Sequence, residues 1–165
     1  MNYLIFTLAI GVGATVVMDL WGIARQWLFG IAPPNYGLVG RWVSYMPRGR
    51  FHHESIAAAS PIHGEHIVGW ITHYLTGIAF AALLISIGGL EWVQKPTIGL
   101  ALAVGIGTVA VPFLLMQPGM GAGIAASRTP HPGAARLQSL ITHAVFGLGL
   151  YLSGWVTHLI YLIGD

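Results

Sequence analysis

Long apolar segments separated by short polar ones dominate the pattern of the chain. Four segments contain no Lys, Arg or Glu, and no Asp apart from Asp19: residues 3–24, 66–90, 97–116 and 137–164. A helix needs roughly 20 apolar residues to cross a bilayer core of about 30 Å. Because backbone groups in hydrocarbon must satisfy their own hydrogen bonds, helices are the expected structure. The pattern predicts four transmembrane helices at about 3–28, 65–90, 97–117 and 134–163.

The composition supports a membrane protein. Of 165 residues, 55% are hydrophobic and 7% are charged, and the mean hydropathy is +0.73. Ordinary soluble domains carry about 25% charged residues, so these few charges cannot cover a water-soluble surface. We expect one all-α transmembrane domain over residues 1–165, an integral membrane four-helix bundle. The first segment is expected to stay in the protein, because no Lys or Arg precedes it as in a signal peptide.

The positive charges predict the orientation of the chain. Six Lys or Arg lie in or beside the first and third connections and one lies in the second: Arg25, Arg41, Arg48, Arg50, Arg128 and Arg136 against Lys95. The positive-inside rule then places the connections at about 30–64 and 118–133 in the cytoplasm and both termini outside. Several aromatic residues sit near helix ends or in the loop, as interfacial anchors do: Trp21, Trp27, Trp42, Tyr45, Trp92 and Trp155.

An internal duplication organises the predicted helices. Two sets of positions repeat: Ala9, Gly11 and Gly13 as Ala103, Gly105 and Gly107, and Ile71, Thr72, His73 and Gly77 as Ile141, Thr142, His143 and Gly147. Each half is thus a helical hairpin, and both hairpins run the same way. Parallel repeats of this kind are related by an axis along the membrane normal. We predict a bundle of two parallel-repeat helical hairpins with His73 and His143 at equivalent depth.

The histidines lie between small residues on their helix faces. Positions i−4, i and i+4 share a face, so His73 lies between Gly69 and Gly77, and His143 lies between Ser139 and Gly147. Small residues allow helices to approach closely. We therefore predict that the second and fourth helices meet with both imidazoles in or beside the contact. These histidines could equally serve as polar packing partners without any chemistry, and both interpretations stay open.

Three further residues extend this candidate polar site. Asp19 lies inside the first predicted helix, where a carboxylate either reaches the headgroup water or is buried and becomes protonated or paired. His66 lies seven residues before His73 on the same face. Gln117 occupies the matching end of the third helix, which we expect Pro112 to kink. The candidate ligand- or proton-binding set is therefore Asp19, His66, His73, Gln117 and His143.

The first connection, at about 30–64, is long for a compact bundle, and long loops tend to be functional or disordered. Its end is rich in possible metal ligands: His52, His53, Glu54, His63 and Glu65. Imidazole and carboxylate suit zinc, iron, copper or nickel, but these residues show no recognised ligand spacing. Surface histidines near lipid phosphates explain them as well, so a metal ion stays one alternative. The absence of cysteine excludes thiolate ligands and disulfides.

Short stretches along the chain carry a family resemblance: Met18-Asp19-Leu20-Trp21, Asn35-Tyr36, Val39-Gly40-Arg41-Trp42, Arg48-Gly49, Gly69-Trp70 with His73-Tyr74, and Gln117-Pro118-Gly119-Met120-Gly121. With them the chain resembles a small bacterial inner-membrane family classed as a domain of unknown function. The resemblance covers nearly the whole chain. It implies an inner-membrane protein with four helices, and it implies no activity.

Several functions fit these observations. We favour a small carrier or channel-like protein, a homo-oligomer, in which Asp19, His73 and His143 bind a proton, a metal ion or a small polar solute. A membrane redox subunit is the first alternative, because paired histidines on facing helices can ligate haem b. The second is a structural or assembly subunit of a membrane complex. An enzyme is disfavoured, since no nucleophile lies beside a base, and no basic stripe indicates nucleic acid.

Overall fold

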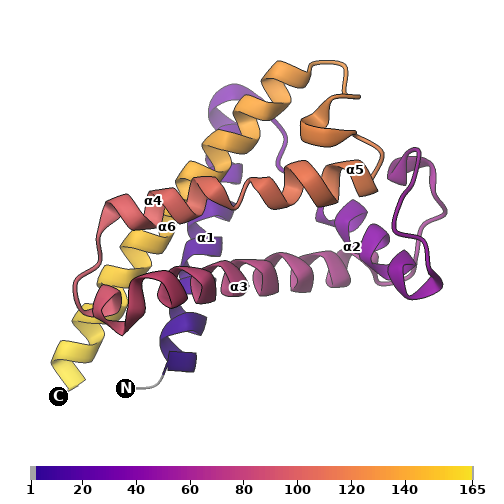
Figure 1. The fold of residues 1–165 in the computed structure, drawn as a ribbon. Helices are drawn as coiled ribbons and strands as arrows, with labels where there is room; N and C mark the ends of the chain where they lie inside the picture. The colour runs from indigo at the N-terminus through magenta and orange to yellow at the C-terminus, as the bar shows by residue number, and fades with distance from the viewer. Residues whose placement is uncertain (1–2, 165) are drawn as a thin grey trace. The chain divides into compact units, whose positions relative to one another are not determined.

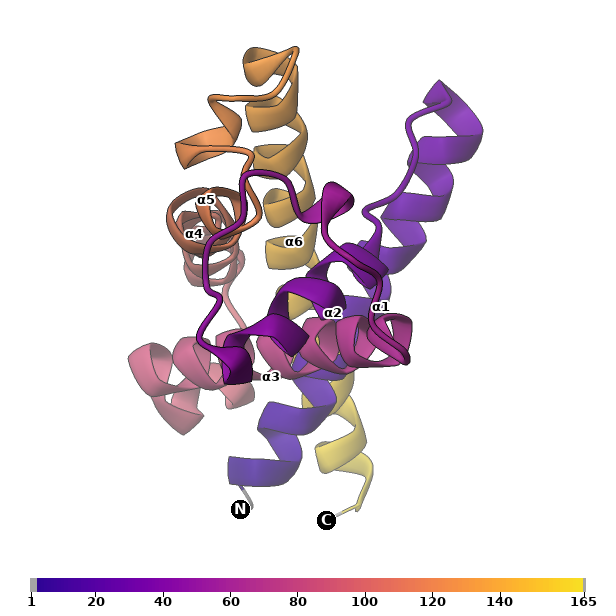
Figure 2. The ribbon, with the colours of Figure 1, turned by 90° about the vertical axis from the view of Figure 1, so that its right-hand side faces the viewer.

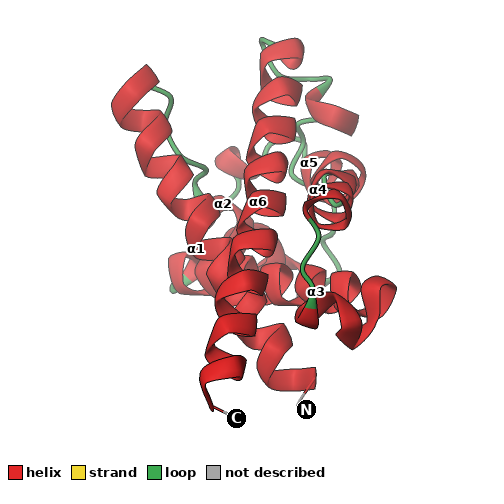
Figure 3. Cartoon of the chain, turned by 90° about the vertical axis from the view of Figure 1, so that its left-hand side faces the viewer, coloured by secondary structure: helices red, strands yellow, loops and turns green. Residues whose placement is uncertain are grey.

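The computed structural model describes residues 3–164, and the side chains of residues 3–160. No strand occurs among the described residues, which form helices joined by loops (Figure 3). Four helices are long and apolar enough to cross a membrane: Tyr3–Phe29, Glu65–Gln94, Ile98–Gly119 and Pro132–Ile160. The predicted all-α class and the four predicted spanning helices are confirmed.

Six α-helices follow one another along the described part of the chain (Figure 1): α1 (Tyr3–Phe29), α2 (Tyr36–Tyr45), α3 (Glu65–Gln94), α4 (Ile98–Gly107), α5 (Gln117–Gly119) and α6 (Pro132–Gly164). The third spanning helix is interrupted, since α4 ends at Gly107 and a π-helical turn covers Pro112–Met116 before α5. Proline lacks an N–H and its ring clashes with the preceding turn. The distortion predicted at Pro112 is therefore present, as a change of helix type.

Helix α2 lies where the sequence predicted only a long connection. Asn35 caps it, because its backbone is extended and its side-chain oxygen accepts a hydrogen bond from the Gly37 N–H at 3.0 Å. Such a cap satisfies one of the N–H groups that the first helical turn leaves unpaired. Pro33 and Pro34 precede the cap and separate α2 from α1. The first connection is thus partly helical.

The chain forms two compact units. Unit 1 comprises residues 1–33, 74–108 and 141–165, and unit 2 comprises residues 34–73 and 109–140. Unit 1 therefore contains α1, the later part of α3, α4 and the later part of α6. Unit 2 contains α2, the first turns of α3 and the segment around α5. The sequence predicted a single domain and gave no sign of this division.

The apolar core of unit 1 is built from all four of its helices. Ile10 of α1, Leu84 and Ile85 of α3 and Leu150 of α6 are at most 1% exposed. Trp92 also belongs to this core, with 4% of its surface exposed, and its indole N–H donates to Thr97 at 3.2 Å. The prediction that Trp92 is an interfacial anchor is therefore wrong. The turn between α3 and α4 folds back over its ring.

Glycines set the distance between the helices of unit 1. A Cβ atom on Gly11 of α1 would overlap the backbone of α3, and one on Gly77 of α3 would overlap the hydroxyl of Thr15. Helices α4 and α6 approach in the same way, since a Cβ on Gly105 would overlap the backbone of Gly147. The sequence predicted that Gly77 and Gly147 bring the second and fourth helices together. Instead their closest contacts run from α3 to α1 and from α6 to α4.

Unit 2 is held by an equally close contact between α2 and the start of α3 (Figure 2). A Cβ on Gly40 would overlap the carbonyl of Glu65, and a Cβ on Gly69 would overlap the carbonyl of Tyr36. Neither clash can be relieved by a rotamer change, because the atoms it involves belong to the backbone. The glycines of the stretches Val39–Trp42 and Gly69–Trp70 thus allow α2 to lie directly against α3.

Candidate functional site

A carboxylate and a phenol meet in unit 1. The hydroxyl of Tyr74 on α3 donates to Oδ2 of Asp19 on α1 at 3.0 Å, and both side chains are half-buried. Both helices are among the four that are long and apolar enough to cross a membrane. A carboxylate in such a position needs a hydrogen-bond partner, since removing it from water is otherwise costly. Tyr74 supplies that partner, and the sequence did not identify it.

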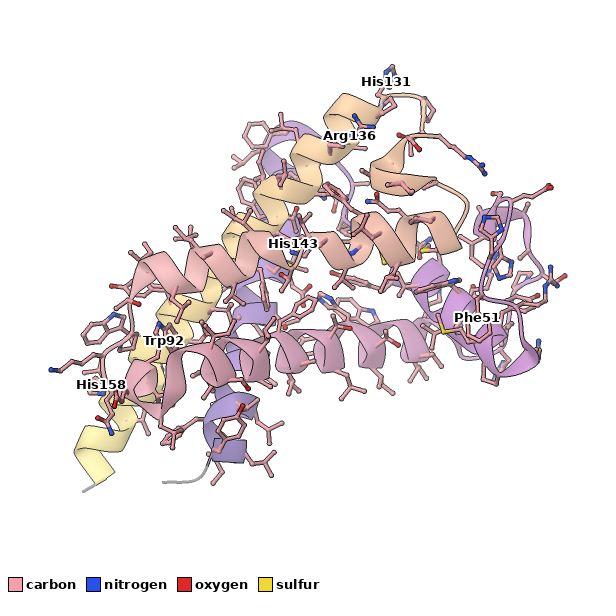
Figure 4. The ribbon with its side chains drawn as sticks, in the orientation of Figure 1. Phe51, Trp92, His131, Arg136, His143 and His158 are labelled. Atoms are coloured by element: carbon pink, nitrogen blue, oxygen red, sulfur yellow. The ribbon has the colours of Figure 1, made fainter. Side chains whose placement is uncertain are left out.

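The imidazole of His143 on α6 lies against the end of α4 in the same unit (Figure 4). Nδ1 of His143 lies 3.2 Å from the hydroxyl of Thr108 and 3.2 Å from the carbonyl oxygen of Gly105. The Thr108 hydroxyl itself donates to the Gly105 carbonyl at 2.7 Å. Since a carbonyl only accepts, Nδ1 must carry the hydrogen. The geometry therefore assigns the Nδ1–H tautomer, with the lone pair on Nε2.

The register of the helices places both pairs at one end of unit 1. Helices α1 and α6 run antiparallel, because Gly13 faces Ser153 and Ala14 faces Gly149. Asp19 lies beyond this crossing along α1, and His143 lies before it along α6. At 3.6 residues per turn, each is within about two turns of the crossing. The two ionisable side chains therefore lie on the same side of it.

His73 has partners of its own in unit 2. Its ring stacks on Tyr36 of α2, with centroids 4.1 Å apart and 25° between the ring planes. Trp70 meets the same imidazole edge-on, with centroids 5.9 Å apart. His73 belongs to unit 2 and His143 to unit 1. The predicted meeting of the two imidazoles, and the haem ligation that depends on it, stay predictions.

The remaining members of the predicted polar set also lie in unit 2. His66 is exposed, and its ring approaches Gly37 of α2, where an added Cβ would lie 2.8 Å from its Cε1. Gln117 at the start of α5 is half-buried, and its Oε1 has no hydrogen-bond partner among the described residues.

Arg41, which is buried, and Glu65, which is half-buried, form a clamp that the sequence did not predict. Nε and Nη2 of Arg41 donate to the two carboxylate oxygens of Glu65 at 2.8 and 2.7 Å. Nη1 of Arg41 donates to the carbonyl of Ala59 at 2.9 Å, and the Ile62 N–H donates to Glu65 at 2.9 Å. The hydrogen bond to Glu65 raises the pKa of Arg41 above its ordinary value. Arg41 is therefore a structural residue as well as a positive charge.

The possible metal ligands of the first connection do not converge. Among residues 3–164, no group of three or more His, Cys, Asp or Glu side chains is placed to hold a metal ion. Glu65 is committed to Arg41. His53 is buried, with 4% exposed, and its ring meets Tyr45 edge-on at 5.0 Å, whereas His52, Glu54 and His63 are exposed. A metal site therefore gains no support from this geometry.

Both connections that were predicted to be cytoplasmic dock on each other within unit 2. The backbone N–H of His53 donates to the Gly119 carbonyl at 2.9 Å, and that of Ile56 donates to Met120 at 3.0 Å. Gly121, with φ of 95°, lies so close to Glu54 that an added Cβ would overlap its carbonyl. Gly121 of the third connection thus allows the two connections to pack closely.

The comparisons with known proteins identify a family without an activity. The model of the family described as "Protein of unknown function (DUF2938)" matches residues 8–157. No curated protein and no solved structure matches the chain. The matched range contains Asp19, Tyr74, Thr108 and His143, so the polar pairs of unit 1 lie inside the family region. The chain therefore belongs to the DUF2938 family of proteins of unknown function.

Proposed function

We propose that this protein is a small multi-pass carrier or channel-like protein whose polar site in unit 1 binds a proton or a small polar solute. The observation that carries the proposal is the pair of hydrogen-bonded ionisable groups among membrane-spanning helices: Asp19 with Tyr74 and His143 with Thr108. Ionisable side chains are costly within a bilayer and mark ion and proton pathways there. None of these four side chains belongs to the apolar core of unit 1.

The chemistry of the two groups suits reversible proton binding. Asp19 accepts a hydrogen bond from Tyr74 as a carboxylate, and it can take up a proton. His143 is held through Nδ1, so its Nε2 lone pair can accept a proton or a hydrogen bond from a solute. Imidazole and carboxylate are the groups from which proton relays in pumps and transporters are built. A solute with hydrogen-bond donors would find two acceptors at this end of unit 1.

Two further features of the chain bear on the proposal, the number of its spanning helices and the distribution of its Arg residues. Four spanning helices per chain leave little room for a pathway, so we propose that the protein acts as a homo-oligomer or within a larger membrane complex. We further propose, from the excess of Arg in the two docked connections, that these connections lie in the cytoplasm and that both termini lie outside the bacterial inner membrane.

Proton flux in proteoliposomes tests the proposal. A pH-sensitive dye trapped in vesicles would report proton entry driven by a potassium diffusion potential. Wild-type protein is expected to raise the flux above that of protein-free vesicles, and Asp19→Asn and His143→Ala to lower it at least tenfold. His158→Ala is the matched control, because His158 lies on the same helix against Trp155 and outside the site.

The outcomes separate the proposal from its alternatives. Full flux in both site variants would exclude Asp19 and His143 from the pathway. Equal losses in all three variants would indicate a general effect on the fold and would count against a specific site. If wild-type vesicles are no more permeable to protons than empty ones, proton transport is excluded. The same vesicles should then show His143-dependent uptake of a small polar solute such as labelled glycerol, or the proposal fails.

A further inference from the structure

The turn that follows α2 presents a fixed group of exposed side chains. This basic turn, residues 48–52, begins at the last residue of a short 3₁₀ helix, Met46–Arg48, which Gly49 caps in a left-handed conformation with φ of 74°. The Gly49 N–H donates to Met46 at 2.9 Å, and the indole N–H of Trp42 donates to the Phe51 carbonyl at 2.9 Å. These bonds hold the backbone of the turn against α2.

Two arginines of the basic turn are positioned by one aromatic ring. The guanidinium carbons of Arg48 and Arg50 lie 5.5 and 5.1 Å from the ring centroid of Tyr45. Both arginines are exposed, and the one ion pair found among the described residues joins other groups, Arg41 and Glu65. Stacking on an aromatic face orders a guanidinium without neutralising its charge. The turn therefore offers two ordered positive charges to an anion.

An exposed aromatic side chain lies between these charges and a histidine. Phe51 is 62% exposed and follows Arg50, and exposed His52 comes next (Figure 4). Large apolar side chains flanked by cations are typical of segments that lie in the bilayer interface, where the apolar part enters the acyl boundary and the cations meet lipid phosphates. No acidic residue lies between Tyr36 and His53 to oppose such binding.

We propose that the basic turn docks onto anionic phospholipid headgroups, with Arg48 and Arg50 binding phosphate and Phe51 entering the acyl boundary. The charge complementarity and the exposed phenylalanine carry this inference, and it does not depend on the polar site of unit 1. A lipid surface is the partner of choice because α1 and α3, which flank this connection in sequence, are long and apolar enough to cross a bilayer. A basic side chain at an anionic surface contributes about 1 kcal/mol, a factor of about five in binding.

Lipid retention measures this docking directly. Purified protein is exchanged into mixed micelles with equal amounts of phosphatidylglycerol and phosphatidylcholine, and the bound lipids are counted by native mass spectrometry. Wild-type protein is expected to retain phosphatidylglycerol preferentially. Arg48→Gln with Arg50→Gln should reduce this preference by at least fivefold, whereas Arg48→Lys with Arg50→Lys should preserve most of it. Lys95→Gln with Arg128→Gln is the matched control, since it removes the same net charge from exposed positions elsewhere.

Phe51→Ser supplies an independent arm, because it leaves the charge unchanged at an exposed position. It should weaken retention of both lipids and keep their ratio. Equal loss in the Gln variants of the turn and of the control would show a general charge effect and overturn the proposal. Displacement of bound phosphatidylglycerol by millimolar glycerol phosphate would indicate a phosphate site, or docking of a soluble phosphorylated partner, and would also overturn it. An unchanged preference for phosphatidylglycerol in the variant that combines Arg48→Gln with Arg50→Gln would also overturn the proposal.

Discussion

His53 is a buried histidine whose backbone joins the two docked connections. Burial lowers the pKa of its imidazole below the ordinary value, and the charges of Arg50 and His52 lower it further. The folded protein therefore keeps His53 neutral under conditions in which the unfolded chain already binds a proton. Because the unfolded state then holds more protons, stability decreases as the pH falls below about 6.5, until the folded-state pKa is passed.

Thermal unfolding in detergent at pH 7.5 and pH 5 tests the role of His53. Wild-type protein should melt at a lower temperature at the acidic pH, and His53→Gln should lose part of that difference because its side chain does not titrate. His63→Gln provides the comparison, since His63 is exposed in the same connection. If His63→Gln removes as much of the pH dependence as His53→Gln, the buried imidazole is not its source.

Residue identity alone revealed one partner in each polar pair of unit 1. Asp19 and His143 were predicted as site residues, whereas Tyr74 and Thr108 were not. Their contacts follow from the register of the helix crossings, which the glycines set. The antiparallel contact of Gly105 with Gly147 could have located Thr108 opposite His143, three positions along one helix and four back along the other. The contact of Gly77 with Thr15 could likewise have located Tyr74 opposite Asp19.

The clamp between Arg41 and Glu65 could not be found in this way. Arg41 was interpreted as an orientation signal and Glu65 as a possible metal ligand, because each residue type suits those roles. Their pairing depends on the close packing of α2 against α3. No periodicity relates two residues that are 24 positions apart in a connection. Where such contacts decide the role of a residue, the residue type alone does not predict that role.

At the scale of the elements, two glycines of one helix differ in their importance for helix packing. In α4, a Cβ on Gly105 would overlap Gly147, whereas one on Gly107 would meet nothing within 4 Å. We predict that Gly105→Ala destabilises the protein by about 1–3 kcal/mol, the usual cost of overpacking a close contact. Gly107→Ala should change stability by no more than about 0.5 kcal/mol, as exposed substitutions usually do.

Unfolding in mixed micelles with increasing dodecyl sulfate would give both values. Each substitution adds one methyl group to α4, so the comparison of Gly105→Ala with Gly107→Ala isolates the effect of the helix contact. Equal effects of the two substitutions would contradict the crossing of α4 and α6 at Gly105. The crossing also positions Thr108 against His143, and Gly105→Ala should therefore reduce proton flux as well as stability.

Helix α2 shows what limits prediction at this scale. A capping asparagine after two prolines is a usable helix signal, and Asn35 follows Pro34. The segment is too short and too mixed in polarity to resemble a spanning helix, so it was included in the long connection.

Trp92 was misjudged for a related reason. Its position near a helix end suggested the interface, but the turn after α3 buries it.

At the scale of the whole molecule, the spanning helices were predictable because a bilayer imposes strong requirements. Length, low charge and self-satisfied backbone bonds leave few alternatives for such segments. The division into two units depends on contacts between segments far apart in sequence, which the hydrophobic pattern does not encode. The docking of the first and third connections is a partial exception. Their shared excess of Arg already predicted that they lie on the same side of the membrane.

The central claim is that α6 holds His143 through Nδ1 against α4 and leaves Nε2 available. Solid-state ¹⁵N NMR of histidine-labelled protein in lipid bilayers at neutral pH measures this directly, with His143→Gln used to assign the signal. We predict that the hydrogen of His143 is on Nδ1 and that Thr108→Val shifts this resonance. An Nε2–H tautomer, or a spectrum unaffected by Thr108→Val, would contradict the account.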